Sequence, residues 1–430
     1  YQALQRLKTS GNGIYLAPLR ILALENYERL NREGVPCNLL TGEEDIQIPG
    51  AQHLCCTVEK ADLRAHYDVA VVDEAQLVAD SQRGDAWTRA ILGLCCPEIH
   101  LCGAALVKDQ LSAMIDSCGD SFILNEYSRL VPLRMLSAPV RLSAPEAGDA
   151  FVAFSKRRVI ALARDFRQRG VSASVIYGDL PPEVRRVQYD KFISGENPVL
   201  VATDAIGMGV NLPIRRIIFT AVEKFDGETL RTLTTQEVKQ IAGRAGRIGI
   251  FDVGYVGALD RDALELIEDR LHDEDPPVQQ AVVGPSEAIL QIDLLPLQQK
   301  VALWSTQPEV MDRYRKKDMR NQLIILDLLK SYHLGESVEW KLMLLPFDVE
   351  NEILLAQFES YVNEYFVAHQ PELSRPLPPG PSRGDYEIYY QQISLYYSFS
   401  KNFDTPMDEQ WVAQTRAQVS KRIQTLMERD

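Results

Sequence analysis

Two patterns of apolar and polar residues alternate from the start of the chain to about residue 260. Short apolar runs predict buried strands, and the stretches between them, with apolar residues every three or four positions, predict helices. The predicted strands are Gly13–Pro18, Asn38–Gly42, His53–Glu59, Tyr67–Glu74, Glu98–Gly103, Val152–Phe154, Ala173–Tyr177, Val199–Thr203, Arg216–Ala221 and Gly254–Leu259. The predicted helices include Leu19–Glu33, Ala86–Leu94, Lys156–Arg169 and Pro182–Ser194. This alternation predicts an α/β fold with parallel sheets and helices on both faces.

The pattern changes at two places. The stretch Ser128–Ala147 contains three prolines and predicts a hinge between two α/β lobes. After about residue 260 the periodicity becomes helical, which predicts a mostly α-helical C-terminal region. We therefore expect domains at 1–135, 136–262 and 263–430. The tyrosines at 386–397 have the spacing of a helix packing face, which we favour over a base-stacking platform.

Composition narrows the class of protein without deciding it. The net charge of -14 weakens a nucleic-acid-binding interpretation, although a locally basic groove is enough to hold a strand. The seven cysteines lie mostly in apolar runs without CxxC spacing, so we expect reduced, buried thiols and no zinc site. No run of 18 apolar residues occurs, so we expect no membrane span.

An acidic pair, Asp73 and Glu74, follows the apolar run YDVAVV. The carboxyl end of a parallel strand is where open α/β sheets bind ligands. Nucleotide hydrolysis needs one carboxylate to hold the shell of a Mg²⁺ ion and another to orient the attacking water. Asp73 and Glu74 suit these two roles, and a solvated acidic pair that ends a strand is the alternative.

Two arginines, Arg244 and Arg247, follow Gln240 in the string QIAGRAGR. Their spacing predicts that both lie on one face of a helix. Arginines can neutralise the charge that builds up on a transferring γ-phosphate. A surface helix with ordinary ion pairs is the alternative, which we favour less because this string is rare by chance.

A glycine-containing loop lies one strand earlier, in VATDAIGMGVN (201–211). Gly207 and Gly209 stand two apart after a predicted strand, and such a loop can offer backbone N–H groups to phosphates. A glycine pair alone is weak evidence. Its position just before the arginine string makes it informative.

In this order, the three strings resemble the core of a superfamily-2 DExH-type RNA helicase. The likeness is strongest to the mitochondrial degradosome-type RNA helicases and their bacterial relatives. Further matching strings are APLRILALE, LLTGEE, TVE, EIHLCG and IYGDLPPEVR, and together they cover residues 1 to about 260. The resemblance implies two RecA-like lobes with ATP in the cleft, Mg²⁺ as its metal and nucleic acid across the top.

The resemblance also implies roles for particular residues. Asp73 and Glu74 would handle magnesium and water, Asp204, Gly207 and Gly209 would lie near the nucleotide, and Gln240, Arg244 and Arg247 would face its phosphates. The residues implied to contact the RNA backbone are Pro18, Leu19, Arg20, Thr41, Gly42 and Thr57 in the first lobe, and Phe154, Ser155, Tyr177, Gly178 and Thr203 in the second. The stretch Glu223–Thr234, with Asp226 and Gly227 at its turn, predicts a hairpin. It is either a wedge that separates strands or, as we favour, a plain connection.

One departure concerns the phosphate loop. In the family a GxxxSGKT loop precedes the helix that YQALQRL matches, and no GKT occurs in this sequence. The lysine for the β- and γ-phosphates, the hydroxyl for magnesium and the N–H cradle are therefore not among these residues. We expect either a fragment of a longer protein, which Tyr1 in place of Met favours, or a shortened relative without ATPase activity.

Three functional hypotheses follow. The first is an ATP-dependent 3′-to-5′ RNA helicase that acts on RNA with a 3′ tail and partners an exoribonuclease, in a bacterial cytoplasm or a mitochondrial matrix. The second is a DNA helicase or translocase, since the motor motifs do not distinguish the sugar. The third is a nucleic-acid clamp that does not respond to nucleotide, which the retained acidic and arginine pairs disfavour.

The missing loop leads to a direct prediction. The 430-residue chain should bind ATP poorly and show no RNA-stimulated hydrolysis, because no lysine is placed against the β- and γ-phosphates. Phosphate release measured with and without single-stranded RNA tests this. RNA-stimulated turnover by these residues alone would contradict it.

Overall fold

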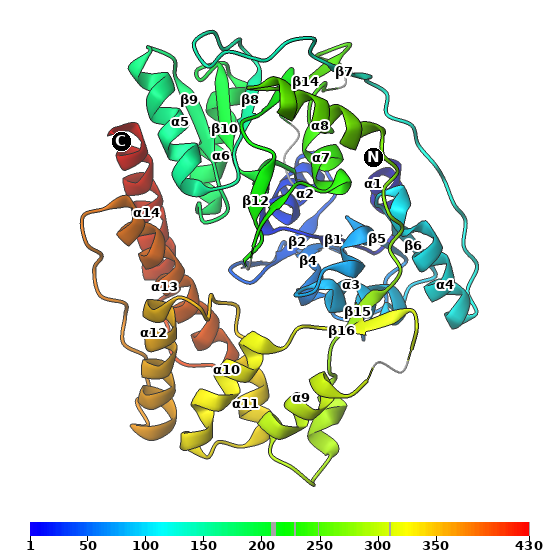
Figure 1. The fold of residues 1–430 in the computed structure, drawn as a ribbon. Helices are drawn as coiled ribbons and strands as arrows, with labels where there is room; N and C mark the ends of the chain where they lie inside the picture. The colour runs from blue at the N-terminus through cyan, green and yellow to red at the C-terminus, as the bar shows by residue number, and fades with distance from the viewer. Residues whose placement is uncertain (208–211, 228, 248, 309–310, 430) are drawn as a thin grey trace. The chain divides into compact units, whose positions relative to one another are not determined.

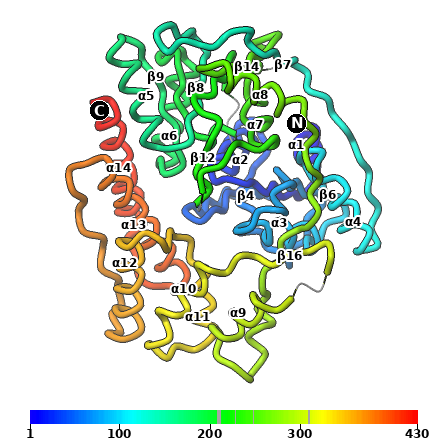
Figure 2. Tube along the Cα trace, in the orientation of Figure 1, coloured from blue at the N-terminus to red at the C-terminus, as the bar shows by residue number. Residues whose placement is uncertain are grey.

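The computed structural model describes residues 1–207, 212–227, 229–247, 249–308 and 311–429. Its chain divides into two compact units (Figures 1 and 2). Unit 1 comprises Tyr1–Leu124 and Pro277–Val419, and unit 2 comprises Asn125–Pro276 and Ser420–Asp430. Each unit is built on its own six-stranded sheet.

The sheet of unit 1 has the strand order β3-β2-β4-β1-β5-β6. Its strands are β1 (Gly13–Ala17), β2 (Cys37–Leu40), β3 (Asp45–Ile46), β4 (His53–Thr57), β5 (Val69–Val72) and β6 (Glu98–Leu101). All neighbouring strands pair in parallel except β2 and β3. The helices of this lobe are α1 (Gln2–Lys8), α2 (Arg20–Arg32), α3 (Gly84–Gly93) and α4 (Lys108–Cys118).

The two faces of this sheet carry separate apolar cores. Alternate residues of β1 point to opposite faces, as strand geometry requires. Ile14 lies in the core that contains Trp87 of α3, whereas Tyr15 lies in the core that contains Leu30 of α2. Helices therefore cover both faces, as the apolar runs predict.

The C-terminal segments of unit 1 form a largely helical region that follows the sheet of this unit in contact with α3. Strands β15 (Ala281–Val283) and β16 (Tyr314–Lys316) form a small parallel sheet, and Ala281 packs into the core that contains Trp87. The helices are α9 (Leu297–Thr306), α10 (Arg320–Leu329), α11 (Glu336–Met343), α12 (Glu352–Val362) and α13 (Arg383–Asn402). Helices α12 and α13 lie side by side (Figure 1). Helix α14 (Glu409–Arg429) follows, with its residues up to Val419 in unit 1.

The sheet of unit 2 is parallel throughout, with the order β7-β14-β11-β8-β10-β9. Its strands are β7 (Leu133–Met135), β8 (Asp149–Val152), β9 (Ala173–Ile176), β10 (Val199–Ala202), β11 (Arg216–Phe219) and β14 (Gly254–Ala258). Its helices are α5 (Lys156–Gln168), α6 (Pro182–Ile193), α7 (Thr235–Ala242) and α8 (Arg261–His272). The steps β8 to β9 and β9 to β10 run in opposite directions across the sheet, so right-handed crossovers place α5 and α6 on opposite faces.

The predicted hairpin is present in unit 2. Strands β12 (Glu223–Phe225) and β13 (Leu230–Thr232) pair antiparallel. Its turn is closed by Asp226, whose side chain accepts a hydrogen bond from Thr229 N at 2.8 Å. Gly227 has a φ of 105°, a value that favours glycine.

The predicted fold class is confirmed: two parallel α/β sheets followed by C-terminal helices. The stretch predicted as a hinge, Ser128–Ala147, contains β7, which pairs with β14, and its role as a hinge stays a prediction. Two local predictions were wrong. The strand predicted at Val152–Phe154 lies earlier, at Asp149–Val152. Of the thiols predicted to be buried, Cys95 and Cys118 are exposed.

The sequence predicts neither a membrane span nor a zinc site, and the structure can be searched for both within its described residues. Among them, no helix combines the length and apolar character needed to cross a membrane. Within the same part of the chain, no group of three or more potential metal ligands from His, Cys, Asp and Glu side chains comes together.

A buried ion pair at the amino-terminal edge of unit 2 allows a stability test. Asp149 is fully buried and both its oxygens accept from Arg216 at 2.6 Å. Glu146 contacts the same guanidinium at 2.5 Å, but its side chain is 53% exposed. Asp149→Ala should lower the free energy of unfolding by about 3–5 kcal/mol, because it leaves a largely buried arginine without its main partner. Glu146→Ala should cost less than about 1 kcal/mol. Urea unfolding checks the difference, and equal costs would contradict it.

Candidate functional site

The carboxyl edge of the unit 1 sheet collects the residues that were predicted for the first lobe. Because its main strands are parallel, the residues after each strand meet at one edge. Pro18, Leu19 and Arg20 follow β1, Thr41 and Gly42 follow β2, and Thr57 ends β4. Asp73 and Glu74 follow β5, next to β1 on its other side. The residues expected to contact RNA thus lie at the end of β1 and on its β4 side, whereas those expected to handle ATP lie on its β5 side.

Hydrogen bonds to neighbouring groups fix Asp73. Tyr15 on β1 donates its hydroxyl proton to Asp73 Oδ2 at 2.6 Å, and Glu74 N donates to Oδ1 at 3.0 Å. Burial, with the Asp73 charge as the next cause, raises the pKa of Tyr15 well above its usual value, so Tyr15 stays a donor. Trp87 Nε1 also donates to the Asp73 carbonyl at 2.9 Å. The carboxylate is therefore held in one orientation.

Glu74 has a left-handed backbone, with a φ of 50°. A residue other than glycine in this region is strained and needs support from its surroundings. Here the conformation ends β5 and starts a short turn of 3₁₀ helix, Ala75–Ala79. Strain of this kind clusters at functional sites, which agrees with the role predicted for the pair.

Gln76 connects the acidic pair to the end of β6. Its amide nitrogen donates to Glu74 Oε2 at 2.5 Å, and its amide oxygen accepts from Ala104 N at 3.1 Å. Gly103 lies close beside it: a Cβ there would lie 2.9 Å from the same amide oxygen, so a side chain at this position would displace the Gln76 amide. Burial and the Asp73 charge raise the pKa of the neighbouring Cys102 thiol to about 11, so it stays neutral. Sequence reasoning did not identify this bridge.

The carboxyl edge of unit 2 gathers the remaining predicted RNA contacts. Phe154 and Ser155 follow β8, Tyr177 and Gly178 follow β9, and Thr203 follows β10. Ser155 caps α5 and is exposed, as is Gly178. Tyr177, by contrast, is 1% exposed. Its ring lies within the lobe, so only its backbone is suited to contact a ligand.

Gly207 brings the nucleotide loop and the arginine string together. Its carbonyl accepts hydrogen bonds from Gln240 Nε2 at 3.3 Å and from Arg244 Nε at 3.0 Å. Gly207 ends the turn Asp204–Gly207, which starts directly after Thr203. Three of the residues predicted to act on ATP in this lobe are thus in contact. The predicted Gly209 lies outside the described residues.

The arginines do not lie on a helix, which corrects the sequence prediction. Helix α7 ends at Ala242, and Arg244 follows in a turn. Gly246 has a φ of 76°, and a Cβ there would lie 2.7 Å from Val131, so the chain turns away from the helix axis. Arg247 lies past this turn, and none of the contacts described for Gly207 involves it.

Arg129, which sequence reasoning missed, supports this turn. Its guanidinium donates to the carbonyls of Gly243, at 2.7 Å, and of Ala245. Burial, with the Arg244 charge as a further cause, lowers its pKa. The only signal in the sequence was a basic residue in an otherwise proline-rich connection.

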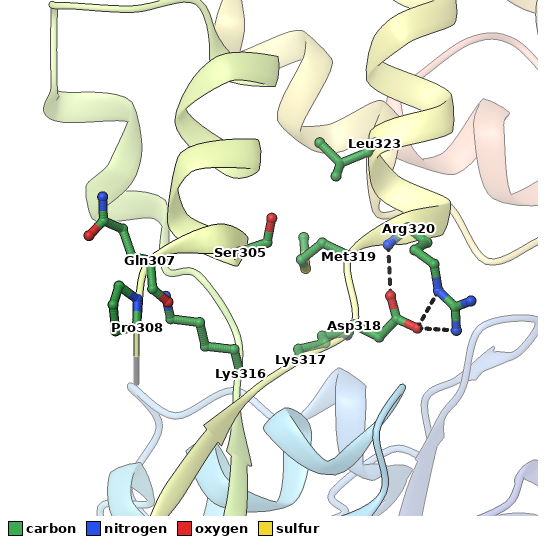
Figure 3. Close-up of a pocket in the computed structure, with 9 residues that line it drawn as sticks. All are labelled: Ser305, Gln307, Pro308, Lys316, Lys317, Asp318, Met319, Arg320 and Leu323. Carbon is green, nitrogen blue, oxygen red and sulfur yellow. Dashed lines mark hydrogen bonds and ion pairs between the residues drawn. The ribbon is translucent and has the colours of Figure 1, made fainter. Parts of the chain in front are cut away.

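A hollow of about 470 Å³ lies elsewhere in unit 1, between the end of α9 and the start of α10 (Figure 3). Its charged residues already have protein partners. Lys317 pairs with Asp85 at 2.9 Å, and Arg320 with Asp318 at 2.7 Å (Figure 3). Lys316 donates to the carbonyl of Gln307 at 2.5 Å. None of the predicted site residues lines it.

Two protein-family models match the stretches of the chain that contain these two sets of predicted residues. Residues 1–127 match the model of the DEXQ-box helicase domain of Suv3, and residues 136–249 match the helicase conserved C-terminal domain. A solved structure, the E. coli DExH-box NTPase HrpB, superposes with a TM-score of 0.52 at 18% identity. It covers 96% of this chain and 53% of HrpB, and it supports the fold alone.

Several relatives match at higher identity. The ATP-dependent RNA helicase SUV3, mitochondrial, of Oryza sativa is 35% identical over 100% of this chain and 77% of the relative. The DExH-box ATP-dependent RNA helicase DExH16, mitochondrial, of Arabidopsis thaliana is 35% identical over 97% and 76%. The mouse SUPV3L1 helicase is 42% identical over 66% of this chain, which is 38% of its own length. The chain therefore belongs to the Suv3 family of superfamily-2 DExH-type helicases.

Proposed function

We propose that this chain is the motor core of an ATP-dependent RNA helicase. One RecA-like lobe is built on each six-stranded sheet, with the boundary before β7 rather than at 135/136, and a helical region follows at 263–430. The observation that carries the proposal is the Asp73–Glu74 pair at the carboxyl edge of a parallel sheet, in a chain of the Suv3 family. In the second lobe, the contact of Gly207 with Gln240 and Arg244 brings together the residues that we propose for the other half of the ATP site.

The acidic pair divides its work between metal and water. A Mg²⁺ ion typically takes one or two carboxylates, several waters and the phosphates of the substrate. The Asp73 carboxylate fits this, because Tyr15 and the Glu74 N–H hold it in one orientation at the carboxyl edge of the sheet. Bound Mg²⁺ would offset the charge on the phosphate oxygens. Glu74 would orient the attacking water and accept its proton, and Gln76 holds the Glu74 carboxylate.

The second lobe would supply positive charge. Arg244 and Gln240 lie side by side on the Gly207 carbonyl, and Arg129 holds the turn that carries Arg244. We propose that Arg244 and Arg247 stabilise the charge on the transferring γ-phosphate. Asp204, Gly207 and Gly209 would line the nucleotide.

RNA is the proposed nucleic acid, because the matched relatives are named RNA helicases. We propose contacts with its backbone through the edge residues Pro18–Arg20, Thr41, Gly42 and Thr57, and through 154–155, 177–178 and Thr203. A 3′ tail as the loading site and an exoribonuclease as the partner remain proposals from the family resemblance. The relatives' names favour a mitochondrial matrix over a bacterial cytoplasm.

A fusion that carries a Suv3-type GxxxSGKT loop ahead of Tyr1 is needed to compare the hypotheses, because these residues alone should not use ATP. Unwinding of matched RNA and DNA duplexes with 3′ tails by this fusion separates the RNA helicase from a DNA translocase. A clamp without catalysis would bind RNA with the same affinity with and without ATP, even in the fusion.

Removal of the Glu74 carboxylate should abolish catalysis but not binding. We place a Suv3-type GxxxSGKT loop ahead of Tyr1 so that ATP can be held. Glu74→Gln in this fusion should lower kcat for RNA-stimulated hydrolysis by about 10²–10⁴-fold, because the general base is lost. RNA affinity should stay unchanged. Glu98→Gln, at the opposite edge of the same sheet, is the control. Equal loss in both variants would refute the role of Glu74.

The hairpin has features that favour a wedge over a plain connection. Phe225 and Leu230 pair across its strands and are 62% and 65% exposed. Its base is fixed, because Lys224 pairs with Asp204 at 2.9 Å and with Glu237 at 2.8 Å. Burial alone would raise the pKa of Glu237, but hydrogen bonds from Arg231 and Lys224 lower this pKa to about 2. We therefore propose that the exposed apolar pair stacks against a base at the duplex end.

This proposal separates unwinding from ATP use. In the loop-bearing fusion, Phe225→Ala should reduce duplex unwinding several-fold while RNA-stimulated ATP hydrolysis stays within about twofold, since the loss of one stacking ring affects strand separation alone. Phe225→Trp keeps an aromatic face and should retain unwinding. A parallel fall in both activities for Phe225→Ala would argue for a merely structural hairpin.

A further inference from the structure

Four charged side chains form a cluster in unit 1, where the turn after β2 meets α13 and α14. They are Arg20 at the start of α2, Glu43 and Glu44 in the turn, and Arg416 on α14. Two positive and two negative charges cancel. The cluster lies at the edge where the proposed function puts RNA contacts, and the proposed ATP chemistry does not use it.

Arg20 is bound by both carboxylates of the turn. Its Nε lies 2.7 Å from both oxygens of Glu44, and its Nη1 lies 2.5 Å from Glu43 Oε2. The side chains of all three residues are only 16–23% exposed. Burial alone would lower the pKa of Arg20, but Glu43 and Glu44 outweigh it, so the net direction is upward.

Arg416 shares Glu43 with Arg20, since both guanidinium groups contact Glu43 Oε2. Its Nη2 lies 3.4 Å from Glu43 Oε2, and its Nη1 lies 3.4 Å from the Glu43 carbonyl. The guanidinium also faces the rings of Tyr390 and Tyr397, with centroid distances of 5.7 and 5.1 Å. Its side chain is 8% exposed, so its position on the turn is set by packing.

The cluster contains a residue proposed to contact RNA. Thr41 Oγ1 accepts hydrogen bonds from the backbone N–H groups of Glu43, at 3.1 Å, and Glu44, at 2.9 Å. The same hydroxyl donates to the Glu44 carboxylate. Arg416 contacts Glu43, which lies 373 residues earlier in the chain, and is therefore two contacts away from Thr41 and Arg20.

We propose that Arg416 is a positioning residue for RNA, because it neutralises the second carboxylate of the Thr41–Glu44 turn and so keeps the RNA-facing edge of unit 1 from becoming acidic. The inference rests on the proposed RNA contacts of Thr41, Gly42 and Arg20. It makes the C-terminal helices a determinant of RNA affinity, through charge on α14 and the tyrosines of α13.

The test changes the charge of the cluster in both directions. Arg416→Met leaves it at -1 and should weaken binding of a fluorescein-labelled 20-nucleotide oligo(U) RNA about fivefold, since the added negative charge repels phosphates. Glu43→Gln leaves it at +1 and should strengthen binding about fivefold, with the slope of log Kd against log salt steeper by up to about one. The double variant should return close to the unsubstituted chain. Fluorescence anisotropy on the 430-residue chain without nucleotide, from 50 to 200 mM KCl, measures all three.

An ion pair between helix α1 and strand β6 of the same unit provides the control. Arg6 and Glu98 pair at 2.7 Å at the amino-terminal end of β6, opposite the RNA edge. Arg6→Met and Glu98→Gln carry the same charge changes and should move the Kd less than twofold. Loss of folding cannot imitate the expected gain for Glu43→Gln.

Two results would overturn the inference. If Arg416→Met and Glu43→Gln shift the affinity in the same direction, or if Glu43→Gln leaves it unchanged, Arg416 serves packing alone while the proposed RNA binding stands. If the unsubstituted chain binds no RNA at any salt concentration, the proposed function itself fails, and the role of Arg416 with it.

Discussion

Parallel pairing of strands is the constraint that places the predicted site residues of each unit. We call the set at the carboxyl edge of each sheet a half-site. In each unit the strands that precede the predicted residues run in the same direction, so every segment that follows a strand emerges at the same edge. Thr57, at the end of β4, and Asp73, after β5, thereby flank one central strand, β1, and Thr41 lies one strand further out, after β2. The sheet brings these residues to one edge, and side-chain contacts such as the hydrogen bond from Tyr15 to Asp73 then fix the orientation of each group.

The sequence predicted this edge well because apolar runs mark strands whatever their neighbours are. The acidic pair follows β5, and the glycine loop follows β10, as their apolar runs indicated. Strand ends were less predictable where apolar residues continue past the hydrogen-bonded ladder. Phe154 is apolar like the strand before it, yet β8 ends at Val152, because only the residues from Asp149 to Val152 have partners on both neighbours.

The candidate site was predicted in its residue types but not in its supporting contacts. Periodicity extended α7 through both arginines, whereas α7 ends at Ala242 and Gly246 takes a positive φ just beyond Arg244. The role of Arg129 and the contact of Gln76 with the end of β6 were missed, because their partners there are backbone groups at Ala104, Gly243 and Ala245. Such contacts depend on where two distant loops meet, and no local pattern in the sequence reports that.

The packing of Ala281 against α3 bears on how this protein can be divided. The apolar face that contains Trp87 is completed by residues of β15, β16 and the segment before them, including Val278 and Tyr314. A shortened protein that stops after the second sheet would keep both half-sites but leave this face uncovered. Exposed apolar surface of this kind promotes self-association. The segments around β15 and β16 therefore help to keep the first lobe soluble. A protein that contained only the two sheets and their helices would tend to self-associate.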